Sequence, residues 1–382
     1  MTKVAHLITR LDLGGAQQNT LHTVRFLDRA RFSPFLVCGE GGLLDEAARS
    51  DERVRAIFVP PLVREVSPGR DLAALARLTA ILRAERPEIV HTHSSKAGIL
   101  GRLAAAAARV PVVVHTHHGF GFHPGQNPAA RALFVGLERL CARLTTRAVF
   151  VSHANARLAR AVGLIGDEQP TIIRSGVRLA DYPVAVERDA LKMSIGVGRH
   201  KVLVVSIGNL KPQKNAADFV AVAARALKRA PEARFVFIGD GPQRRALEAK
   251  AFSLGLNDRL FFLGWRRDAA RWLAAADAFV MTSLWEGLPR ALVEAMLTGL
   301  PCALYATDGV TDLVRDGVNG LLARPGDAQS LAEKLSSLLT DPALRARLGA
   351  AARASIGPEF DIDEMVRAQE RLYEQLLEGR RG

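Results

Sequence analysis

Two carboxylates stand around a Gly-Leu-Pro turn, where a predicted strand passes into a predicted helix. Glu286 precedes the turn Gly287-Leu288-Pro289, and Glu294 lies roughly 7.5 Å further along the helix axis. The apolar run 278–282 predicts a buried strand, and Pro289 suits the first helical position. A helix N-terminus attracts phosphate, whereas carboxylates accept hydrogen bonds from sugar hydroxyls. The stretch indicates a ligand that carries both groups; the alternative is two glutamates that face solvent.

Other polar groups follow predicted strands in the same half of the chain. Lys211 and Lys214 come after the strand predicted over 201–208, within reach of an anion at its end, and Asn209 lies in the same loop. A solvated turn is the alternative. Gly239 opens the sequence Gly239-Asp240-Gly241-Pro242, which by itself indicates only a tight turn. Leu263 and Gly264 end a further predicted strand.

The first half offers a glycine pair and a group of histidines. Gly14 and Gly15 follow the first predicted strand, where paired glycines let the backbone approach a bound group, although a plain turn is equally compatible. The histidines end two predicted strands: His91 and His93 end one, and His115, His117 and His118 end the other. His118 stands beside Gly119, where the backbone turns.

Zinc binding, a structural role and substrate binding are the alternatives for these histidines. A zinc site is weakly indicated, because the histidines have no Cys or Glu beside them in sequence. Strand alternation also turns His118 away from His115 and His117. We expect most of the histidines to be structural, and His118 to be the one that hydrogen-bonds a polar substrate.

Strands and helices alternate through both halves, which predicts an α/β fold of two doubly wound, parallel sheets with helices on both faces. The first domain is expected over residues 1–180 and the second over 198–359, with a polar linker near 177–198. A final amphipathic helix is expected within 360–382, and Asp361-Ile362-Asp363 more readily caps it than binds metal. Ligands of such sheets bind beyond the C-terminal strand ends, so a cleft between the domains is the expected site.

Composition limits the class of protein. The chain has 382 residues, ordinary hydrophobic content and a net charge of +13, and most of the positive excess lies in residues 1–178. Three separated cysteines predict reduced thiols in a cytoplasmic protein, and neither a signal peptide nor a transmembrane run is evident. The charge suggests an anionic partner, but no nucleic-acid-binding motif accompanies it. Arginines at 131, 139, 143 and 147, interleaved with apolar residues, predict instead a helix that lies on anionic lipid; solvated arginines are the alternative.

Taken together, these motifs resemble the family-four, retaining glycosyltransferases of GT-B fold. The resemblance covers nearly the whole chain. It is carried by the Gly14-Gly15 loop, His118-Gly119, the 208–214 loop, the 239–242 turn, the Glu286…Glu294 block and Asp316-Gly317-Val318-Asn319-Gly320-Leu321. The Glu-x7-Glu block with Gly-Leu-Pro inside it is the most specific element.

The resemblance implies a role for each matching residue. Glu286 would accept hydrogen bonds from the donor sugar, and Glu294 would bind the ribose. Lys214 would neutralise the donor diphosphate, helped by the Gly14 and Gly15 amides and by the helix start near Leu288. His118 would contact the sugar near the reacting centre. The loop 263–265 would hold the base, and the tail helix would return to the first domain.

The implied reaction is transfer of a sugar, with retention of configuration, from a nucleotide-diphosphate sugar, expected to be UDP-linked. Neither a bound metal nor another cofactor is expected, and front-face attack is favoured, with the leaving phosphate taking the acceptor's proton. The expected acceptor is a hydroxyl of a polyprenyl-linked or polysaccharide precursor, reached peripherally on the inner face of the plasma membrane.

Two departures from the family pattern leave rival functions open. Asn209 stands where the family usually has Arg, although Lys211 lies close by in sequence, and Asp312 stands where Glu is common. Asn209 leaves open a non-catalytic nucleotide-sugar-binding module, and a nucleotide-sugar epimerase of similar two-domain architecture is the other alternative.

Overall fold

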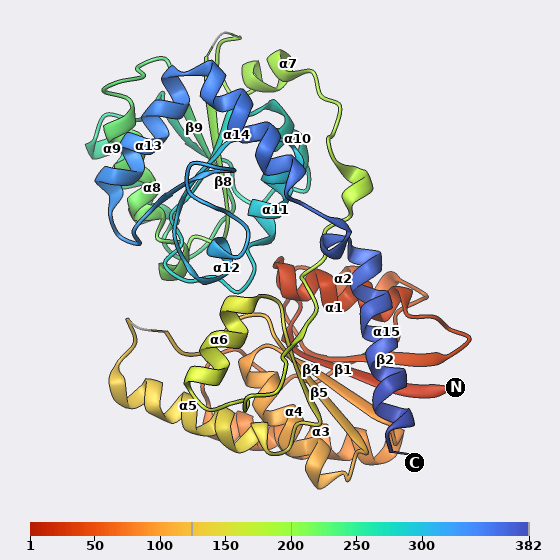
Figure 1. Cartoon of the computed structure of the whole chain (residues 1–382). Coiled ribbons are helices and arrows are strands. Elements are labelled where there is room, and N and C mark those ends of the chain that lie inside the picture. The colour runs from red at the N-terminus through yellow and green to blue at the C-terminus, as the bar shows by residue number, and fades with distance from the viewer. Residues whose placement is uncertain (124, 200, 381–382) are drawn as a thin grey trace. The chain divides into compact units, whose positions relative to one another are not determined.

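The structure, a computed structural model, describes residues 1–123, 125–199 and 201–380. Within them the chain forms two compact units (Figure 1). Unit 1 comprises Met1–Gly176 and Asp361–Gly382, and unit 2 comprises Val177–Phe360. The division falls after Gly176, close to the boundary near residue 180 that the sequence predicts. In each unit helices cover a parallel sheet, which confirms the predicted α/β class.

The sheet of unit 1 has the strand order β3-β2-β1-β4-β5-β6-β7, and all its pairs are parallel. Its strands are β1 Thr2–Arg10, β2 Phe32–Gly39, β3 Ala56–Phe58, β4 Ile89–His93, β5 Val112–His117, β6 Arg147–Phe150 and β7 Thr171–Ile172. Its helices are α1 Gly15–Phe26, α2 Asp45–Ser50, α3 Pro68–Glu85, α4 Ser95–Ala107, α5 Pro128–Ala142, α6 His153–Ala161 and α15 Ile362–Glu378. The order changes direction between β1 and β4, the position where doubly wound sheets hold ligands.

The tail helix α15 belongs to unit 1, as the sequence predicts, and runs beside α1 (Figure 1). Asp361 caps it by accepting hydrogen bonds from the N–H groups of Asp363 and Glu364. Met365 and Tyr373 pack into a core cluster with residues of β1, β4 and β5. One face of the sheet is therefore covered by a segment that lies far away in the sequence.

The sheet of unit 2 has the order β10-β9-β8-β11-β12-β13, again with parallel pairs, and changes direction between β8 and β11. Its strands are β8 Leu203–Ile207, β9 Arg234–Ile238, β10 Leu260–Phe262, β11 Ala278–Met281, β12 Cys302–Tyr305 and β13 Leu321–Ala323. Its helices are α7 Arg188–Met193, α8 Ala216–Ala226, α9 Arg244–Ser253, α10 Ala269–Ala275, α11 Arg290–Leu297, α12 Asp308–Thr311, α13 Ala328–Thr340 and α14 Pro342–Ala354. Short 3₁₀ turns occupy Leu179–Asp181, Pro212–Lys214 and Pro358–Phe360.

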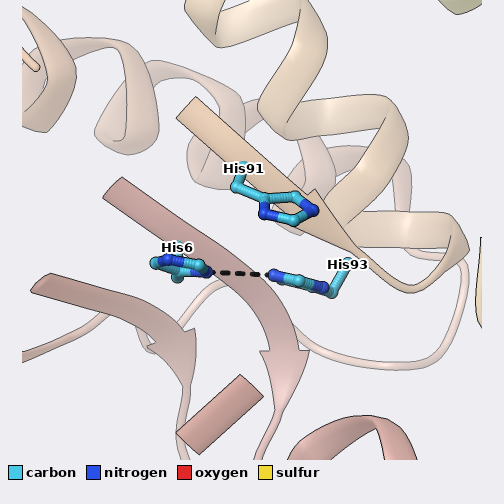
Figure 2. A group of neighbouring side chains, drawn as sticks. All are labelled: His6, His91 and His93. Carbon is cyan, nitrogen blue, oxygen red and sulfur yellow. Dashed lines mark hydrogen bonds between the residues drawn. The ribbon is translucent and has the colours of Figure 1, made fainter. Parts of the chain in front are cut away.

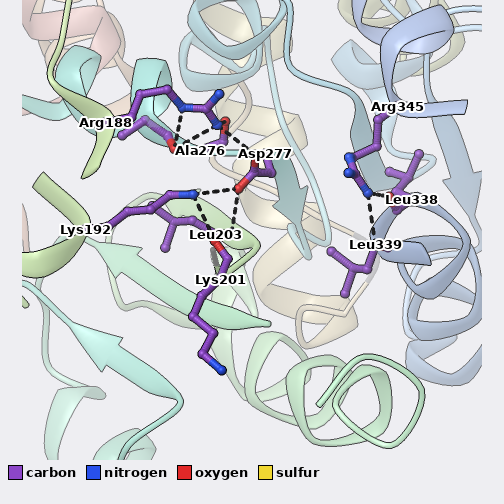
Figure 3. A network of polar contacts seen from close by, with 10 residues as sticks. Arg188, Lys192, Lys201, Leu203, Ala276, Asp277, Leu338, Leu339 and Arg345 are labelled. Carbon is purple, nitrogen blue, oxygen red and sulfur yellow. Dashed lines mark hydrogen bonds and ion pairs between the residues drawn. The ribbon is translucent and has the colours of Figure 1, made fainter. Parts of the chain in front are cut away.

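The segment expected as a linker contains a helix, α7, which is tied to the sheet of unit 2. The Asp277 carboxylate accepts hydrogen bonds from Arg188 at 2.7 Å and from Lys192 at 3.1 Å, both on α7 (Figure 3). It also accepts the Leu203 N–H at 2.8 Å, at the start of β8. The Asp277 carboxylate therefore holds α7 against the N-terminal end of β8.

Three details of the helices correct the sequence analysis. The sequence also predicts a helix from Asp71, as its N-cap, to about Arg86, but α3 begins at Pro68, because proline suits the first turn and Asp71 reaches back to accept the Ser67 N–H. α11 begins at Arg290, so Pro289 is its N-cap and not its first residue. Arg147 begins β6 and is not part of the basic helix α5.

Candidate active site

Glu286 and Lys214 lie in loops that follow neighbouring strands of unit 2. Lys214 ends the 3₁₀ turn after β8, and Glu286 lies between β11 and α11. Because β8 pairs with β11, the loops emerge side by side at the point where the strand order changes direction. That point is the general ligand site of doubly wound sheets.

Hydrogen bonds join the two loops. The Leu284 N–H donates to the Gln213 carbonyl, and the Gln213 side chain donates to the Trp285 carbonyl, both at 2.9 Å. The Thr282 hydroxyl donates to the Lys214 carbonyl at 3.0 Å. The backbone around Lys214 is therefore held against the backbone that carries Glu286.

The side chains of Lys214 and Glu286 form an ion pair, in which the Lys214 ammonium donates to Oε1 of Glu286. Glu286 is only 8% exposed. The alkyl chain of Lys214 passes over Gly208, where a Cβ would lie 3.2 Å from three of its carbons. The Lys214 ammonium and the Glu286 carboxylate therefore compensate each other's charge, because an unpaired charge is costly to bury. A ligand that offers an anion to Lys214 and hydroxyl groups to Glu286 could replace this ion pair.

Glu294 has a partner on its own helix. Nε of Arg290, one turn earlier on α11, lies 3.2 Å from Oε1 of Glu294. Burial raises the pKa of the Glu294 carboxyl, and the nearby Arg290 opposes that rise. The sequence analysis did not single out Arg290, although its i,i+4 spacing from Glu294 is the signal that could have found it.

Glycines let backbone segments meet around this site. Gly239 has φ +136°, and a Cβ there would lie 1.9 Å from the Gly208 carbonyl oxygen. Its N–H donates to the Gly264 carbonyl at 2.8 Å, next to Leu263. These predicted donor-site residues therefore gather at the ends of β8, β9 and β10. On the other side, a Cβ on Gly309 would lie 1.9 Å from the Gly287 carbonyl oxygen, so the Gly287-Leu288-Pro289 turn lies tightly against α12.

Asn209 and Lys211 lie in the loop between β8 and the turn that carries Lys214. The Lys211 N–H donates to the Asn209 carbonyl at 2.8 Å, and both residues are half-buried. Asn209 and Lys211 therefore lie in the same short segment as Lys214.

The sequence analysis gave no role to two hydroxyl groups near the site. Oγ of Ser283 and Oγ1 of Thr307 are buried, and neither makes a hydrogen bond within the described residues. Ser283 follows β11, and Thr307 follows β12 and occupies the N-cap position of α12, although its side chain does not bond to the helix. Buried hydroxyls are nearly always paired, so these two are candidates to bind a polar ligand. Their position directly after apolar strands is the signal that marks them.

In unit 1, Gly14 is the N-cap of α1 and Gly15 is its first residue. Gly14 has φ −143°, an extended conformation, and a Cβ there would meet only the flexible end of Gln17. No side chain caps the helix, so its first N–H groups are not taken by a cap. The loop keeps the amides that phosphate binding would use.

Strand alternation sorts the histidines of β1, β4 and β5 into two groups. His6, His91 and His93 lie on the face that α15 covers, with one ring nitrogen of each within 4.8 Å of the others, and Figure 2 shows the hydrogen bond between His6 and His93. His115 and His117 lie on the opposite face, with Glu138. The sequence analysis overlooked His6, because its place beside β4 depends on the strand order.

Neither histidine group has a full set of free ligand atoms. Both ring nitrogens of His91 are bonded to hydroxyl groups, and both of His93 are bonded to other imidazoles. Glu138 is engaged by the buried guanidinium of Arg102 at 2.6 Å. The donor set therefore fits a hydrogen-bonded network better than a metal centre.

His118 lies at the end of β5 and lines a small cavity of unit 1 together with His93 and Thr116. Its Nε2 is 3.2 Å from Nδ1 of His93, whereas its Nδ1 is buried and makes no hydrogen bond within the described residues. Burial lowers the pKa of the His118 ring to about 4, so the ring is neutral at pH 7.

Comparison with known proteins gives the class. Residues 13–181 match the model of Glycosyltransferase Family 4, and residues 187–355 match that of glycosyl transferases group 1. UDP-Gal:alpha-D-GlcNAc-diphosphoundecaprenol alpha-1,3-galactosyltransferase of Escherichia coli is 36% identical over 346 residues, which cover 90% of this chain and 89% of the relative.

Solved structures agree on the fold. HepE of Anabaena, solved with UDP and glucose, superposes with a TM-score of 0.84 at 22% identity, covering 98% of this chain and 100% of that one. Sucrose-phosphate synthase of Thermosynechococcus elongatus gives a TM-score of 0.85 at 20% identity, covering 99% and 100%.

The fold and the relatives therefore define an enzyme that transfers sugar from a nucleotide-sugar donor, built on the GT-B fold. The chain belongs to the family-four glycosyltransferases, and a retaining mechanism fits that family. The resemblance inferred from the sequence is confirmed, and the epimerase and non-catalytic alternatives are not favoured. Within the described residues, no helix is both long and apolar enough to cross a membrane.

Proposed function

We propose that this enzyme transfers a hexosyl group from a UDP-sugar to a hydroxyl of a polyprenyl-diphosphate-linked saccharide. The observation that carries the proposal is the 36% identity, over 90% of the chain, with an E. coli enzyme named for UDP-Gal and a GlcNAc-diphosphoundecaprenol acceptor. UDP-galactose is accordingly the first donor to test.

Binding of the donor would separate the ion pair between Lys214 and Glu286 in unit 2. Its diphosphate takes the Lys214 ammonium, and its sugar hydroxyls donate to the Glu286 carboxylate. The buried hydroxyls of Ser283 and Thr307 supply two further polar groups close to the same loops. Glu294 binds the ribose, and the loop at Leu263 and Gly264 holds the base. Charge-assisted contacts at a buried site are strong enough to offset the lost ion pair.

The transfer would proceed by front-face attack. The bond from the anomeric carbon to the phosphate oxygen breaks while the acceptor oxygen bonds to the same face, and the leaving phosphate takes the acceptor's proton. Lys214 and the backbone amides stabilise the charge that develops on the phosphate. His118 contacts the sugar near the reacting carbon. We expect no metal requirement, so the transfer rate should be unchanged after treatment with EDTA.

The helix α5 would hold the enzyme at an anionic membrane, on the cytoplasmic face where we propose that it works. Leu133 is 62% exposed and Leu140 is 49% exposed; seven residues apart, they share a side of the helix. Arg131, Arg139 and Arg143 are exposed around them. Apolar side chains among basic ones are typical of helices that lie in the membrane interface.

Liposome flotation tests the membrane surface. Wild-type protein should float with vesicles of anionic phospholipid at low salt, and Leu133→Asp/Leu140→Asp should stay in solution. Leu72→Asp is the matched control, because Leu72 is 69% exposed on α3. If Leu72→Asp abolishes flotation and the double variant keeps it, α5 is not the membrane surface.

A transfer assay tests the function. Isotope-labelled UDP-galactose should pass its sugar to synthetic GlcNAc-diphosphoundecaprenol, and Glu286→Ala should abolish transfer while circular dichroism stays native. Label in an isomerised nucleotide sugar would indicate the epimerase, and binding without turnover would indicate a non-catalytic module. Transfer only to a soluble acceptor would contradict the lipid-linked substrate.

A further inference from the structure

Four histidines form a row at the point where the sheet of unit 1 changes direction. His6 lies in β1, His91 and His93 lie in β4, and His118 follows β5. His6 pairs with His91 across the two neighbouring strands, so their side chains share a face. Tyr373 of α15 packs on that face and contacts the ring of His91. The row lies in a part of the core that also contains buried polar side chains such as Thr116 and Gln369.

Hydrogen bonds connect the rings end to end. Nδ1 of His6 is 3.1 Å from Nε2 of His93, and Nδ1 of His93 is 3.2 Å from Nε2 of His118 (Figure 2 shows the first of these bonds). At the inner end, Nε2 of His6 is 3.5 Å from the Tyr373 hydroxyl. The chain therefore runs from Tyr373 through two imidazoles to His118.

Each ring in the chain is neutral. Burial lowers the pKa of His6 to about 3 and that of His118 to about 4, and it holds the pKa of His93 well below its usual range. A neutral imidazole has one N–H donor and one acceptor nitrogen. Every ring must therefore point its proton in the same direction along the chain, either inward toward Tyr373 or outward toward the cavity.

The hydrogen bonds of the Tyr373 hydroxyl determine the direction in which the ring protons point. Its single proton has three possible acceptors: Nδ1 of His91 at 2.5 Å, Oε1 of Gln369 at 3.3 Å and Nε2 of His6 at 3.5 Å. If the proton goes to either of the two nearer acceptors, the hydroxyl oxygen is left to accept from His6. His6 then carries its proton on Nε2, and the chain runs inward.

An inward chain fixes the state of His118. Nε2 of His6 donates to Tyr373, so Nδ1 of His6 accepts from Nε2 of His93, and Nδ1 of His93 accepts from Nε2 of His118. Nδ1 of His118 is then a bare acceptor. That is the buried nitrogen that makes no hydrogen bond within the described residues.

We propose that His93 and His6, aligned by Tyr373, are positioning residues that hold His118 as its Nε2–H tautomer, with Nδ1 ready to accept a hydrogen bond from a sugar hydroxyl. This rests on the proposed function for the contact between His118 and the sugar. In the other tautomer Nδ1 would be a donor, and a hydroxyl would have to reorient to meet it.

Nitrogen NMR of the whole, substrate-free protein with ¹⁵N-labelled histidine reads the tautomer directly. The His118 signals, identified by their loss in His118→Asn, should show a protonated Nε2 and an unprotonated Nδ1. Tyr373→Phe removes the hydroxyl and should produce a mixture of the two tautomers. A wild-type His118 protonated at Nδ1 would overturn the proposal, whatever the enzyme's substrate proves to be.

Kinetics of paired variants separate positioning from a structural role. His93→Gln keeps an acceptor toward His118 and a donor toward His6, so kcat should stay within about threefold of wild type. His93→Leu breaks the chain and should lower kcat about tenfold, while the Kd for UDP is unchanged. His115→Leu is the control: it removes a buried ring from the opposite face and should leave both kcat and the His118 tautomer unchanged.

The outcomes are distinct. If His93→Gln and His93→Leu lose stability and activity equally, His93 is structural and the proposal fails. If the polyprenyl acceptor receives no sugar, the proposed function fails, but the NMR measurement still reports the tautomer of His118.

Discussion

Lys214→Ala would leave the buried carboxylate of Glu286 without its cation and the departing phosphate without its counter-charge. We expect kcat to fall by about 10²–10³-fold, the range found when one preorganised electrostatic group is removed from a site. Steady-state transfer kinetics and calorimetric titration with UDP measure the effect. Lys334→Ala is the control, because Lys334 pairs with Asp316 on the exposed surface of the same unit. Equal losses in the two variants would contradict the role of Lys214.

Gly309→Ala should displace the Gly287-Leu288-Pro289 turn of the proposed donor site without changing a charged residue. The added Cβ would lie 1.9 Å from the Gly287 carbonyl oxygen, so either α12 or the Gly287-Leu288 turn must move. We expect a loss of about 1–3 kcal/mol in stability and a raised KM for the donor. Gly69→Ala, on α3, is the control, because a Cβ there has no neighbour within 4 Å and the backbone is not in the left-handed region. A normal donor KM in Gly309→Ala would show that the turn does not shape the site.

The sequence marks single residues better than it marks their partners. Glu286 and Lys214 stand out because each follows a predicted strand, but they are 72 residues apart, and only the order β8-β11 brings them together. His6 is the one polar residue in the apolar run 4–8, and only the position of β4 shows what its side chain faces. Partners depend on strand order, which local patterns do not encode.

At the scale of elements, α7 should depend on one carboxylate. Asp277→Ala removes the acceptor that Arg188 and Lys192 share with the start of β8 (Figure 3). Lys192 is buried, so we expect a loss of about 2–4 kcal/mol and faster hydrogen exchange over 188–193. Asp341→Ala, which removes the cap of α14, should leave exchange in α7 unchanged. Unaltered exchange over 188–193 in Asp277→Ala would contradict the tie.

Sequence periodicity predicts most strands and helices but misjudges some ends and one connection. Strands buried on both faces read as apolar runs, so β1, β8 and β11 are evident. The acidic side chain of Asp71 predicts a helix cap at that residue, whereas α3 begins three residues earlier, with Ser67 as its N-cap and Pro68 as its first residue. The segment expected as a linker contains α7, because its short helix is stabilised by distant Asp277 rather than by its own pattern.

At the scale of the molecule, the two units have the same plan but different ionisable interiors. Each sheet changes direction once, between β1 and β4 or between β8 and β11, and each places its polar side chains there. Unit 1 uses neutral histidines, and unit 2 uses a lysine–glutamate pair. Residues 177–360 contain a single histidine, His200, which lies outside the described residues. The units should therefore respond differently to acid.

Acidification from pH 7 to pH 5 should destabilise unit 1 selectively. Burial lowers the pKa of His6 to about 3 and places the pKa values of His91, His93, His115 and His117 well below normal. Between the folded values and the unfolded value of about 6.5, the unfolded state binds more protons, so stability is lost as pH falls through that window. Each ring costs about 2 kcal/mol between pH 7 and pH 5, and a few such rings approach the whole stability of a domain.

The groups of unit 2 do not share this window. Burial raises the pKa of Glu294, so its protonation favours the folded state as pH falls, and the lowered pKa of Asp268 matters only below about 3.8. In unit 1, the contact between His22 and Asp363 at 2.8 Å gains from a proton, but it is one contact against five buried rings. Between pH 7 and pH 5 the net loss of stability is therefore expected in unit 1.

Two probes separate the units in the intact chain. Trp265, Trp272 and Trp285 are the only tryptophans, and all lie in unit 2, so their fluorescence should stay native at pH 5. Hydrogen exchange in β1, β4 and β5 should accelerate over the same range. His93→Gln removes one titrating ring and should reduce the pH dependence of that exchange by about 2 kcal/mol. Loss of native tryptophan fluorescence before exchange rises in β1 would contradict the argument, because it would place the acid-sensitive groups in unit 2.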